Sequence, residues 1–443
     1  MAGRLRVLVT GFGTVPGPNA HSSALLGMAQ SLRGDLDFVT LKTSALAHQS
    51  RLGRARLFRV RTSDEMAEKH AAFARAVNRQ LEAEAYDVVH VRGATEGEVA
   101  IRHRASMGFR FVYEVATFPD EAEGPVAERT WAEAHARCLE HADLILVGAE
   151  AAARALGEQG HAGKVAVVPP GVDVDAYDWW PSFATDTLRL LYLGSFGQDR
   201  DVPTLLGALR AVAQNSPIRV LLAGEPLPER RAQTRRLVRS FGLESCVTVR
   251  GEPRAVAIPS MIAACDVALV TASAAPRFQE LGELPDPLLE YLACRRAVVA
   301  AGVPAVAEVI RDEVEGLLYT PGEEDTLADA ILTLARDVDH RRAIMEAGYE
   351  RVRQRFSSGA RRRRIAEVYE MLAPGSQSYD AWEDGFGDGE GSAPITGLQE
   401  IPSAPTPLPN EPTPMMRDRD PATLRQPRPA LEGSITQVDP PEK

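Results

Sequence analysis

Cysteine is scarce in this sequence of 443 residues, and the few cysteines form no metal-binding or redox pattern. Only four are present, and none of them stands in a Cys-x-x-Cys spacing. Zinc sites and disulfide frameworks need clustered cysteines, so neither is expected here. The sequence therefore predicts reduced, structural thiols in a protein of the cytosol, at Cys138, Cys246, Cys265 and Cys294.

Long apolar runs are missing as well. No stretch of about 18 or more apolar residues occurs, so no membrane-spanning helix is expected. The first residues, MAGRLRVLVTGFG, lead straight into a strand pattern and lack the apolar core of a signal peptide. We expect a cytoplasmic protein, or one that touches the membrane only from its cytoplasmic side.

The chain also lacks the basic excess that nucleic-acid binding requires. Its formal net charge is −11, and residues 373–443 hold 12 acidic and 5 basic side chains, which leaves −4 for the first 372 residues. This part is nearly balanced, so nucleic acid is not an expected partner. No cofactor is expected either.

The composition changes abruptly after residue 372. The last 71 residues contain 13 of the 31 prolines, together with several glycines and acidic residues. This predicts a disordered tail over 373–443. Its run PTPLPNEPTP is a candidate extended ligand for a protein partner.

Strand and helix patterns alternate before the tail, as in parallel α/β sheets. A buried strand at 5–13 runs into glycine turns and a helix, although Gly11, Gly13 and Gly17 do not match the dinucleotide fingerprint G-x-G-x-x-G. We expect four parts: a Rossmann-like N-terminal domain over residues 1–178, a second Rossmann-like domain over 179–356, a terminal helix that returns to the first domain over 357–372, and the tail over 373–443. The family resemblance given below implies that the first domain holds the acceptor and the second the donor.

The stretch at 283–310, ELPDPLLEYLACRRAVVAAGVPAVAEVI, combines an acidic turn, a short helix and a buried strand. Glu283, Asp286 and Glu290 gather around the start of the helix, and 297–301 reads as a strand buried on both faces. A loop that meets a helix N-terminus is a natural phosphate site. We therefore expect the carboxylates to face the other end of a phosphate-bearing ligand.

This stretch and the following EGLLYTPGEEDTLADAILTLARD resemble the donor half of retaining, nucleotide-sugar-dependent glycosyltransferases of the GT-B fold, family-4 type (glycosyl transferases group 1). The resemblance extends in order over roughly residues 5 to 372. It implies an α/β fold with two Rossmann-like, doubly wound domains facing across a cleft. It also implies metal-independent transfer of a sugar from a nucleotide-diphosphate donor to a hydroxyl, with retention of configuration.

The resemblance assigns a donor-binding set to this chain. Glu290 would hold the ribose, Gly251 would lie at the nucleobase, and Gly13 and Gly17 would lie under the diphosphate. A tight turn that needs positive φ is the alternative role for either of the last two glycines. The full predicted set is Gly13, Gly17, Gly194, Ser195, Arg200, Gly251, Leu284 and Glu290.

A diphosphate clamp is expected after the first strand of the second domain. The family form G-R-x-x-x-x-K-G-x-x-x-L provides an arginine and a lysine that stabilise the leaving diphosphate. Here Gly194 takes the place of the glycine, Ser195 that of the arginine and Arg200 that of the lysine. Arg200 keeps the charge and can bind two phosphate oxygens. Ser195 cannot, so half of the clamp is missing or supplied from elsewhere.

The family's catalytic pair is E-x7-E, and the residue eight before Glu290 is Gly282. Glu280 and Glu283 flank this glycine, and a small loop adjustment would bring Glu283 into the vacant role. Pro287 replaces a lysine found in related sequences. The predicted catalytic residues are Arg200 and Glu283, while the leaving phosphate itself serves as the base in enzymes of this type.

The acceptor side is expected at the end of the strand FRFVYEVAT, with Glu114 and Thr117, because open α/β sheets bind ligands at the carboxyl ends of their strands. The family's His-Asp pair is replaced here by Ala116 and Thr117. A carboxylate hydrogen-bonded inside the fold is the alternative role for Glu114.

Two arginine-rich segments have a surface interpretation. The segment 51–61, RLGRARLFRVR, resembles the basic-apolar segments through which some of these enzymes touch the inner membrane, so a peripheral membrane contact is one hypothesis. An exposed loop and helix face is the other. Arg361 to Arg364 are expected on the exposed side of the last helix.

The function predicted from the sequence is therefore glycosyl transfer from a nucleotide sugar to a glycan or lipid-linked acceptor, in bacterial polysaccharide or glycolipid synthesis. The alternative is a catalytically decayed GT-B scaffold or sugar-nucleotide-binding protein, since Ser195, Gly282 and Pro287 depart from the family pattern. A nucleotide-sugar epimerase of related fold is a third hypothesis, which the order of the elements after residue 302 disfavours.

Overall fold

The structure is a computed structural model that describes residues 5–15, 20–32, 34–42, 48–63, 65–116, 124–177, 187–285 and 287–372. Several residues named above lie outside these ranges, namely Gly17, Thr117, Asp286 and the tail 373–443.

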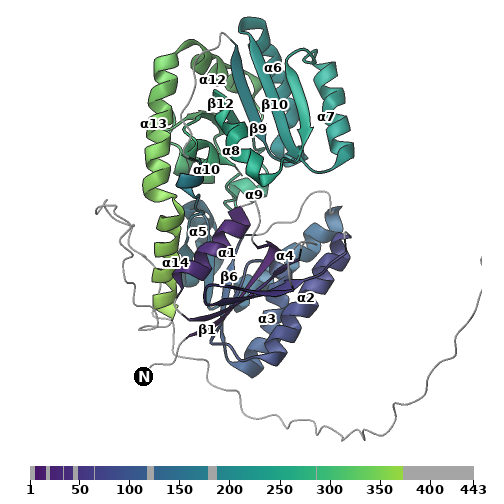
Figure 1. Ribbon diagram of the computed structural model, residues 1–443, viewed down its shortest axis with the longest axis vertical. Coiled ribbons are helices and arrows are strands. Elements are labelled where there is room, and N and C mark those ends of the chain that lie inside the picture. Colours follow the sequence, from purple (N-terminus) through teal and green to yellow (C-terminus); the bar gives the residue numbers. More distant parts are fainter. Residues whose placement is uncertain are drawn as a thin grey trace, which may run out of the picture. The chain divides into compact units, whose positions relative to one another are not determined.

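The N-terminal domain is built on the sheet that contains β1 and β6 (Figure 1). This sheet has eight strands in the order β3-β4-β2-β1-β5-β6-β7-β8. Every neighbouring pair in it is parallel except β3 and β4, which are antiparallel. The strands are β1 (Arg6–Thr14), β2 (Asp35–Leu41), β3 (Gln49–Leu52), β4 (Ala55–Val60), β5 (Val88–Val91), β6 (Arg110–Glu114), β7 (Leu144–Val147) and β8 (Val165–Val167).

Helices cover both faces of this sheet, which explains its apolar strands. Val7 and Val9 of β1 belong to a core that includes residues of α1 and α14, whereas Leu8 belongs to a second core with residues of α2, α3 and α4. The helices are α1 (Ala20–Ser31), α2 (Met66–Ala83), α3 (Ala94–Met107), α4 (Gly124–His141), α5 (Glu150–Leu156) and the C-terminal α14 (Ser358–Leu372).

The second domain has a six-stranded parallel sheet with the order β11-β10-β9-β12-β13-β14. Its strands are β9 (Leu188–Leu193), β10 (Ile218–Glu225), β11 (Val247–Gly251), β12 (Val267–Val270), β13 (Ala297–Ala301) and β14 (Leu317–Tyr319). Its helices are α6 (Val202–Asn215), α7 (Pro228–Ser240), α8 (Ile258–Ala263), α9 (Pro276–Gln279), α10 (Leu288–Ala293), α11 (Pro304–Val309), α12 (Glu324–Arg336) and α13 (Val338–Arg355).

The predicted fold class, two doubly wound α/β domains, is confirmed. The small-residue strand predicted at 297–301 is β13, and all five of its residues are buried. A strand that is covered on both faces needs apolar side chains at every position, which is why the sequence showed a continuous apolar run there.

The expectation of a loop and helix face at 51–61 was wrong. These residues form the hairpin β3–β4 at one edge of the sheet, where β4 pairs with β2. Arg56 makes a two-pronged ion pair with Asp37, and the buried Arg59 donates from Nε to the carbonyl of Val15 at 2.9 Å. The exposed arginines of the segment are Arg51, Arg54 and Arg61.

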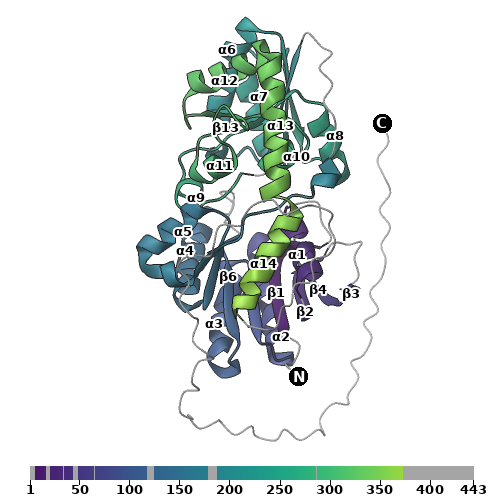
Figure 2. The same cartoon turned by 90° about the vertical axis from the view of Figure 1, so that its left-hand side faces the viewer.

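Helix α14 follows α13 and packs against α1 of the N-terminal domain (Figure 2). Ile365, Val368 and Tyr369 of α14 belong to the N-terminal core. The placement of Arg361 on an exposed face was wrong, because this side chain is buried and donates to Glu114 Oε1 at 2.7 Å. It also donates to the carbonyls of Val168 and Pro169, at 3.1 and 2.9 Å.

Glu114 is the acceptor at the centre of this buried network. Its Oε2 accepts from Arg92 Nε at 2.8 Å and lies 3.2 Å from His90 Nε2. Burial alone would raise the pKa of Glu114, but Arg92, Arg361 and His90 hold it well below its usual range. Burial lowers the pKa of His90, and the neutral ring that results can accept at Nδ1 from Tyr369 Oη, 2.8 Å away.

Glu96, in the first turn of α3, has a raised pKa, in contrast to the lowered pKa of Glu114. It is only 2% exposed, and its Oε1 has no hydrogen-bond partner among the described residues. Burial raises the pKa of Glu96 to about 7, and a backbone hydrogen bond opposes this shift only in part.

We predict that Glu114→Gln destabilises the protein by about 3 kcal/mol near pH 7, because it leaves two buried guanidinium groups without their anion. The pKa of Glu114 is depressed in the folded state, so its contribution is present above the pKa of an unfolded glutamate and is lost as pH falls below it. Urea unfolding of both proteins at pH 7 and near pH 4 measures the difference, which should shrink at the lower pH. The exposed Arg363→Ala on α14 is the control, and equal midpoints for wild type and Glu114→Gln would contradict the prediction.

Glu96→Gln should instead stabilise the protein at pH 8. The folded state holds a proton on Glu96 up to about pH 7, while the unfolded chain loses it near the ordinary value of 4.5. Stability therefore falls as pH rises through this window, by up to about 3 kcal/mol. Urea unfolding at pH 5 and pH 8 should show a gain for the variant only at pH 8. Glu140→Gln, at an exposed position on α4, is the control, and a gain of Glu96→Gln that is equal at both pH values would refute the prediction.

Candidate functional site

The turn after β9 contains the predicted donor residues Gly194 and Ser195, and three contacts fix it. The backbone N–H of Leu193 donates to Tyr291 Oη at 2.8 Å, and Tyr192 Oη donates to the carbonyl of Ser195 at 2.7 Å. The N–H of Phe196 donates to Glu225 Oε2 at 2.6 Å. The turn is therefore held by side chains from β9, β10 and α10.

This turn lies unusually close to the end of β10. At Gly224, φ is 116°, and a Cβ there would stand 2.6 Å from the backbone nitrogen of Gly194. Only glycine fits such a position, because a side chain would overlap the neighbouring backbone. The approach brings the end of β10, with Glu225, against the predicted donor turn.

Arg200 closes the short 3₁₀ helix Gln198–Arg200, which follows this turn. The N–H of Ser273 donates to the carbonyl of Asp199 at 2.7 Å, and the hydroxyl of Thr271 donates to the carbonyl of Arg200. The guanidinium of Arg200 lies 5.1 Å from the ring centroid of the fully buried Phe278. Residues at the end of the adjacent strand β12 thus set the position of Arg200.

The two predicted catalytic residues meet. Arg200 Nη2 donates to Glu283 Oε1 at 3.3 Å. The other oxygen, Glu283 Oε2, accepts from Arg277 Nε at 2.5 Å, and Arg277 Nη1 lies 3.5 Å from Asp199 Oδ2. Burial opposes the charge of Arg277, but Glu283 and Asp199 outweigh it and raise the pKa of this guanidinium. Two positive and two negative side chains thus form one cluster.

Gly282 stands where the family pattern has a glutamate, and the structure explains the glycine. Its φ is 66°, in the left-handed region that favours glycine, and a Cβ there would lie 2.7 Å from the Cβ of Ala152 on α5. A glutamate would meet both a backbone penalty and a steric clash at this position. The adjacent Glu283 is the carboxylate that reaches the site.

Leu284 and Glu290 line a cavity of about 40 Å³ together with the Pro-Pro-Gly-Val segment that follows β8. The cavity is lined by Pro170, Gly171, Val172, Leu284, Pro285, Leu288, Leu289 and Glu290. Typical ligand pockets measure about 300 Å³ or more. The cavity therefore marks where predicted donor residues meet the first domain, but it is too small for a nucleotide.

The remaining predicted residues stand apart from this cluster. Gly251 ends β11, which is separated from β9 by β10. Gly13 lies on β1 and Glu114 ends β6, both in the other sheet. The carboxylate of Glu114 already accepts from Arg92 and Arg361, which is the arrangement that its alternative role inside the fold requires.

Some residues of the site were not singled out from the sequence. Glu225 holds the predicted donor turn, Arg277 shares Glu283 with Arg200, and Phe278 lies under both guanidinium groups, at 5.1 and 5.4 Å. The sequence contained one indirect signal for Arg277, because the serine at position 195 leaves half of the predicted clamp either missing or supplied from another segment.

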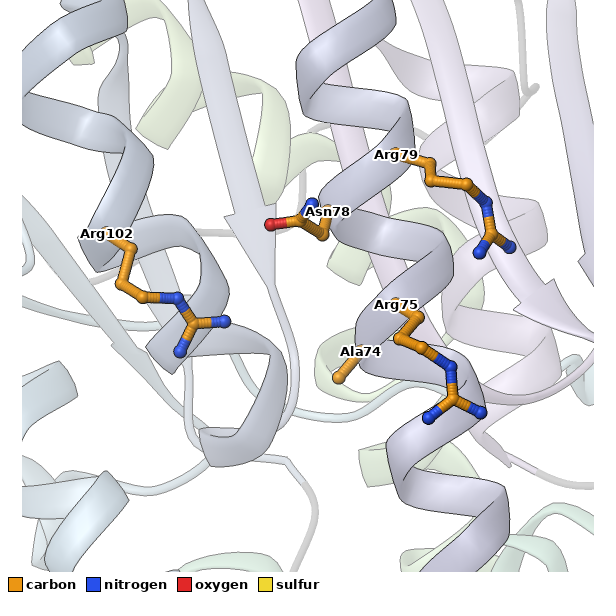
Figure 3. A pocket seen from close by; sticks show the side chains of 5 residues that line it. All are labelled: Ala74, Arg75, Asn78, Arg79 and Arg102. Carbon is orange, nitrogen blue, oxygen red and sulfur yellow. The ribbon is translucent and has the colours of Figure 1, made fainter. Parts of the chain in front are cut away.

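A larger hollow of about 350 Å³ lies away from these residues, on α2 and α3 (Figure 3). It is lined by Ala74, Arg75, Asn78, Arg79 and Arg102. Figure 3 shows Arg102 extending from α3 towards α2, whereas Arg75 and Arg79 extend away from α3. The three guanidinium groups therefore do not converge on a single anion.

The described residues contain neither a metal-binding cluster nor a helix that could span a membrane. No group of three or more His, Cys, Asp or Glu side chains in these ranges is arranged to hold a metal ion. Within the same ranges, no helix has the length and apolar character needed to cross a membrane.

Comparison with known families gives two matches that follow each other along the chain. Residues 19–176 match the family described as Glycosyltransferase Family 4, and residues 187–337 match Glycosyl transferases group 1. Among curated proteins, the D-inositol 3-phosphate glycosyltransferase of Kribbella flavida is 28% identical over 326 residues, which cover 65% of this chain and 73% of that protein. The enzyme of the same name from Corynebacterium urealyticum is 25% identical over 312 residues, covering 65% and 72%.

Solved structures show the same fold. Sucrose-phosphate synthase from Thermosynechococcus elongatus superposes with a TM-score of 0.69 at 20% identity, over 83% of this chain and 99% of that one. Anabaena Alr3699/HepE, solved in complex with UDP and glucose, gives 0.65 at 19% identity, also over 83% and 99%. The consecutive family matches and the common architecture of two parallel-sheet domains agree, and the chain belongs to the glycosyltransferases of the GT-B fold.

Proposed function

We propose that this protein transfers a sugar from a nucleotide-diphosphate donor to a hydroxyl acceptor, with retention of configuration and without a metal ion. The observation that carries the proposal is the placement of Arg200, which is fixed beside β12 with its guanidinium 3.3 Å from Glu283. The family resemblance implies that Arg200 stands where the family's lysine meets the donor diphosphate. Retention and metal independence rest on the family resemblance.

In the proposed reaction, the bond between the sugar C1 and the phosphate oxygen breaks, and both electrons go to the phosphate. The acceptor oxygen forms the new bond to C1, and its proton passes to the leaving phosphate. Negative charge thus grows on the diphosphate as the bond breaks, and Arg200 is placed to stabilise that charge in a partly buried site. Glu290 holds the ribose.

The nucleotide-sugar donor has support from structural neighbours. Anabaena Alr3699/HepE was solved with UDP and with UDP-glucose. In our proposal, the corresponding ligand of this chain lies against the turn after β9 and the segment that begins at Leu284. Because the cavity at Glu290 measures only about 40 Å³, binding requires its lining segments to separate.

The proposed acceptor is a glycan or a lipid-linked sugar of bacterial cell-surface synthesis, met in the cytoplasm. Exposed Arg51, Arg54 and Arg61 on and beside the β3–β4 hairpin allow a peripheral contact with anionic lipid, at about 1 kcal/mol for each basic residue near the surface. The apolar Leu57 of this hairpin points into the core, so the proposed contact is electrostatic.

We predict that Arg200→Ala weakens the binding of a nucleoside diphosphate by about tenfold or more, the effect of losing a charge-assisted contact to phosphate. Calorimetry and thermal-shift measurements with UDP, GDP and ADP on the full chain identify the preferred nucleobase and measure the loss of affinity in the variant. Arg210→Ala, an exposed arginine on α6, is the matched control and should bind as the wild type does.

The same experiment separates the two functional hypotheses. Binding that depends on Arg200, followed by release of the diphosphate when the matching sugar nucleotide is added, supports the transferase. Binding without any turnover of the sugar nucleotide supports the scaffold instead. If none of the three diphosphates binds, the proposed function is wrong.

A second prediction concerns the ribose. The wild type should bind a ribonucleoside diphosphate about tenfold or more tightly than its 2′-deoxy counterpart, and Glu290→Gln should remove most of this preference, because a hydrogen bond to a carboxylate is worth more than one to an amide. Calorimetric titration of both proteins with UDP, GDP, ADP and their 2′-deoxy forms checks it. Glu280→Gln, on the loop before Gly282, is the control. A preference that is unchanged in Glu290→Gln would place the ribose elsewhere.

A further inference from the structure

The further inference rests on the proposed function and concerns the charge that Ser195 cannot supply. The carbonyl of Ser195 accepts from Tyr192, and the next N–H donates to Glu225, so the backbone of this turn is held by β9 and β10. The hydroxyl of a serine has no charge to offer a diphosphate. A single arginine, Arg200, would then face a ligand that carries two phosphate groups.

Arg277 lies beside Arg200 although the two residues are far apart in the sequence. Arg200 ends the 3₁₀ helix after β9, and Arg277 lies on α9, which follows β12. Because β9 and β12 are neighbours in the sheet, their carboxyl ends place the two segments together. Both guanidinium groups lie near the ring of the buried Phe278, at 5.1 and 5.4 Å from its centroid.

The two arginines already share one anion. Glu283 Oε1 accepts from Arg200 Nη2 at 3.3 Å, and Glu283 Oε2 accepts from Arg277 Nε at 2.5 Å. Two oxygens of one planar anion thus bridge two guanidinium groups, and two oxygens of a phosphate could meet the same pair of donors. The carboxylate occupies the place that a more highly charged ligand would take.

The cluster is also accessible enough to exchange its anion. The side chains of Arg200, Arg277 and Glu283 are 15%, 22% and 14% exposed, so none is sealed in the core. Asp199 stays near Arg277, at 3.5 Å, and can hold that side chain in place when Glu283 turns away. A diphosphate offers more negative charge than the single carboxylate it would displace.

We propose that Arg277 is the second cation of the diphosphate clamp and supplies, from α9, the charge that is absent at Ser195. Arg277 and Arg200 bind the diphosphate from two neighbouring strand ends, and Glu283 is the anion that they release. Arg277 therefore touches the donor directly and stabilises the charge that grows on the leaving phosphate.

The test compares Arg277→Ala, Arg277→Lys and the wild type as full chains, with UDP, GDP and ADP and the matching monophosphates as probes in calorimetry. Arg277→Ala should bind the diphosphate about tenfold or more weakly, while the affinity for the monophosphate, which has no second phosphate, changes little. Arg277→Lys keeps the charge that pairs with Glu283 but not the planar fork, so its diphosphate affinity should be intermediate.

Arg189→Ala is the matched control. Arg189 lies at the opposite end of β9, is 30% exposed, and is ion-paired with Asp266 at 2.7 Å. The variant loses a partly buried ion pair, as Arg277→Ala does, but it should not change the preference for diphosphate over monophosphate. The melting temperature of each variant shows whether it is folded. If Arg277→Ala is not folded, the diphosphate affinity of Arg277→Lys tests the role of Arg277 instead.

Two outcomes overturn the proposal for Arg277 and leave the proposed function standing. One is a diphosphate affinity that falls in Arg200→Ala but not in the Arg277 variants. The other is a loss in the Arg277 variants that is equal for mono- and diphosphates, which would indicate a structural role. If the wild type binds no nucleoside diphosphate, the proposed function fails, and the role of Arg277 fails with it.

Discussion

The carboxylate of Glu283 holds together the part of the second domain in which the predicted catalytic residues lie. Arg200 and Arg277 come from different segments, and two guanidinium groups placed side by side repel each other. One shared anion turns that repulsion into attraction and fixes the 3₁₀ helix after β9 against α9. Phe278 provides the surface on which both side chains rest. The site is therefore an electrostatic balance between segments, and any ligand that binds there must preserve it.

The N-terminal domain contains a second cluster in which one carboxylate pairs with two guanidinium groups. Glu114 is surrounded by Arg92, His90 and Arg361, and the last of these comes from the final helix, 247 residues further along the chain. This cluster is closed to solvent, whereas the cluster at Glu283 is partly open. The closed cluster ties α14 to the sheet, whereas the side chains at Glu283 keep part of their surface exposed to solvent.

The sequence predicted the fold well, because the parallel strands are buried on both faces and their apolar runs are continuous, as at 297–301. It also named Arg200 and Glu283 as catalytic residues. The structure places their side chains in contact, and their catalytic role stays a prediction. Thr117 and Gly17 lie outside the described residues, so their roles stay predictions.

What the sequence missed depends on contacts between distant residues. The hairpin at 51–61 was missed because alternating arginines and apolar residues suit an edge strand as well as a surface helix. One of four consecutive arginines, Arg361, is buried because Glu114 lies opposite it, and no local pattern distinguishes it from the other three. Arg277 was missed for the same reason. Ser195, where the family pattern has an arginine, is 82 positions earlier in the sequence, and the two segments meet only because β9 and β12 are neighbours in the sheet.

Gly282 has a consequence for any attempt to engineer this loop. The left-handed backbone and the neighbouring Ala152 together mean that a substitution by glutamate would strain the loop and collide with α5. A carboxylate at position 282 is thus more than one substitution away, because backbone and neighbour would have to change together. Substitutions around Glu283 meet no such double requirement at position 282, so they are the simpler way to vary the charge of this cluster.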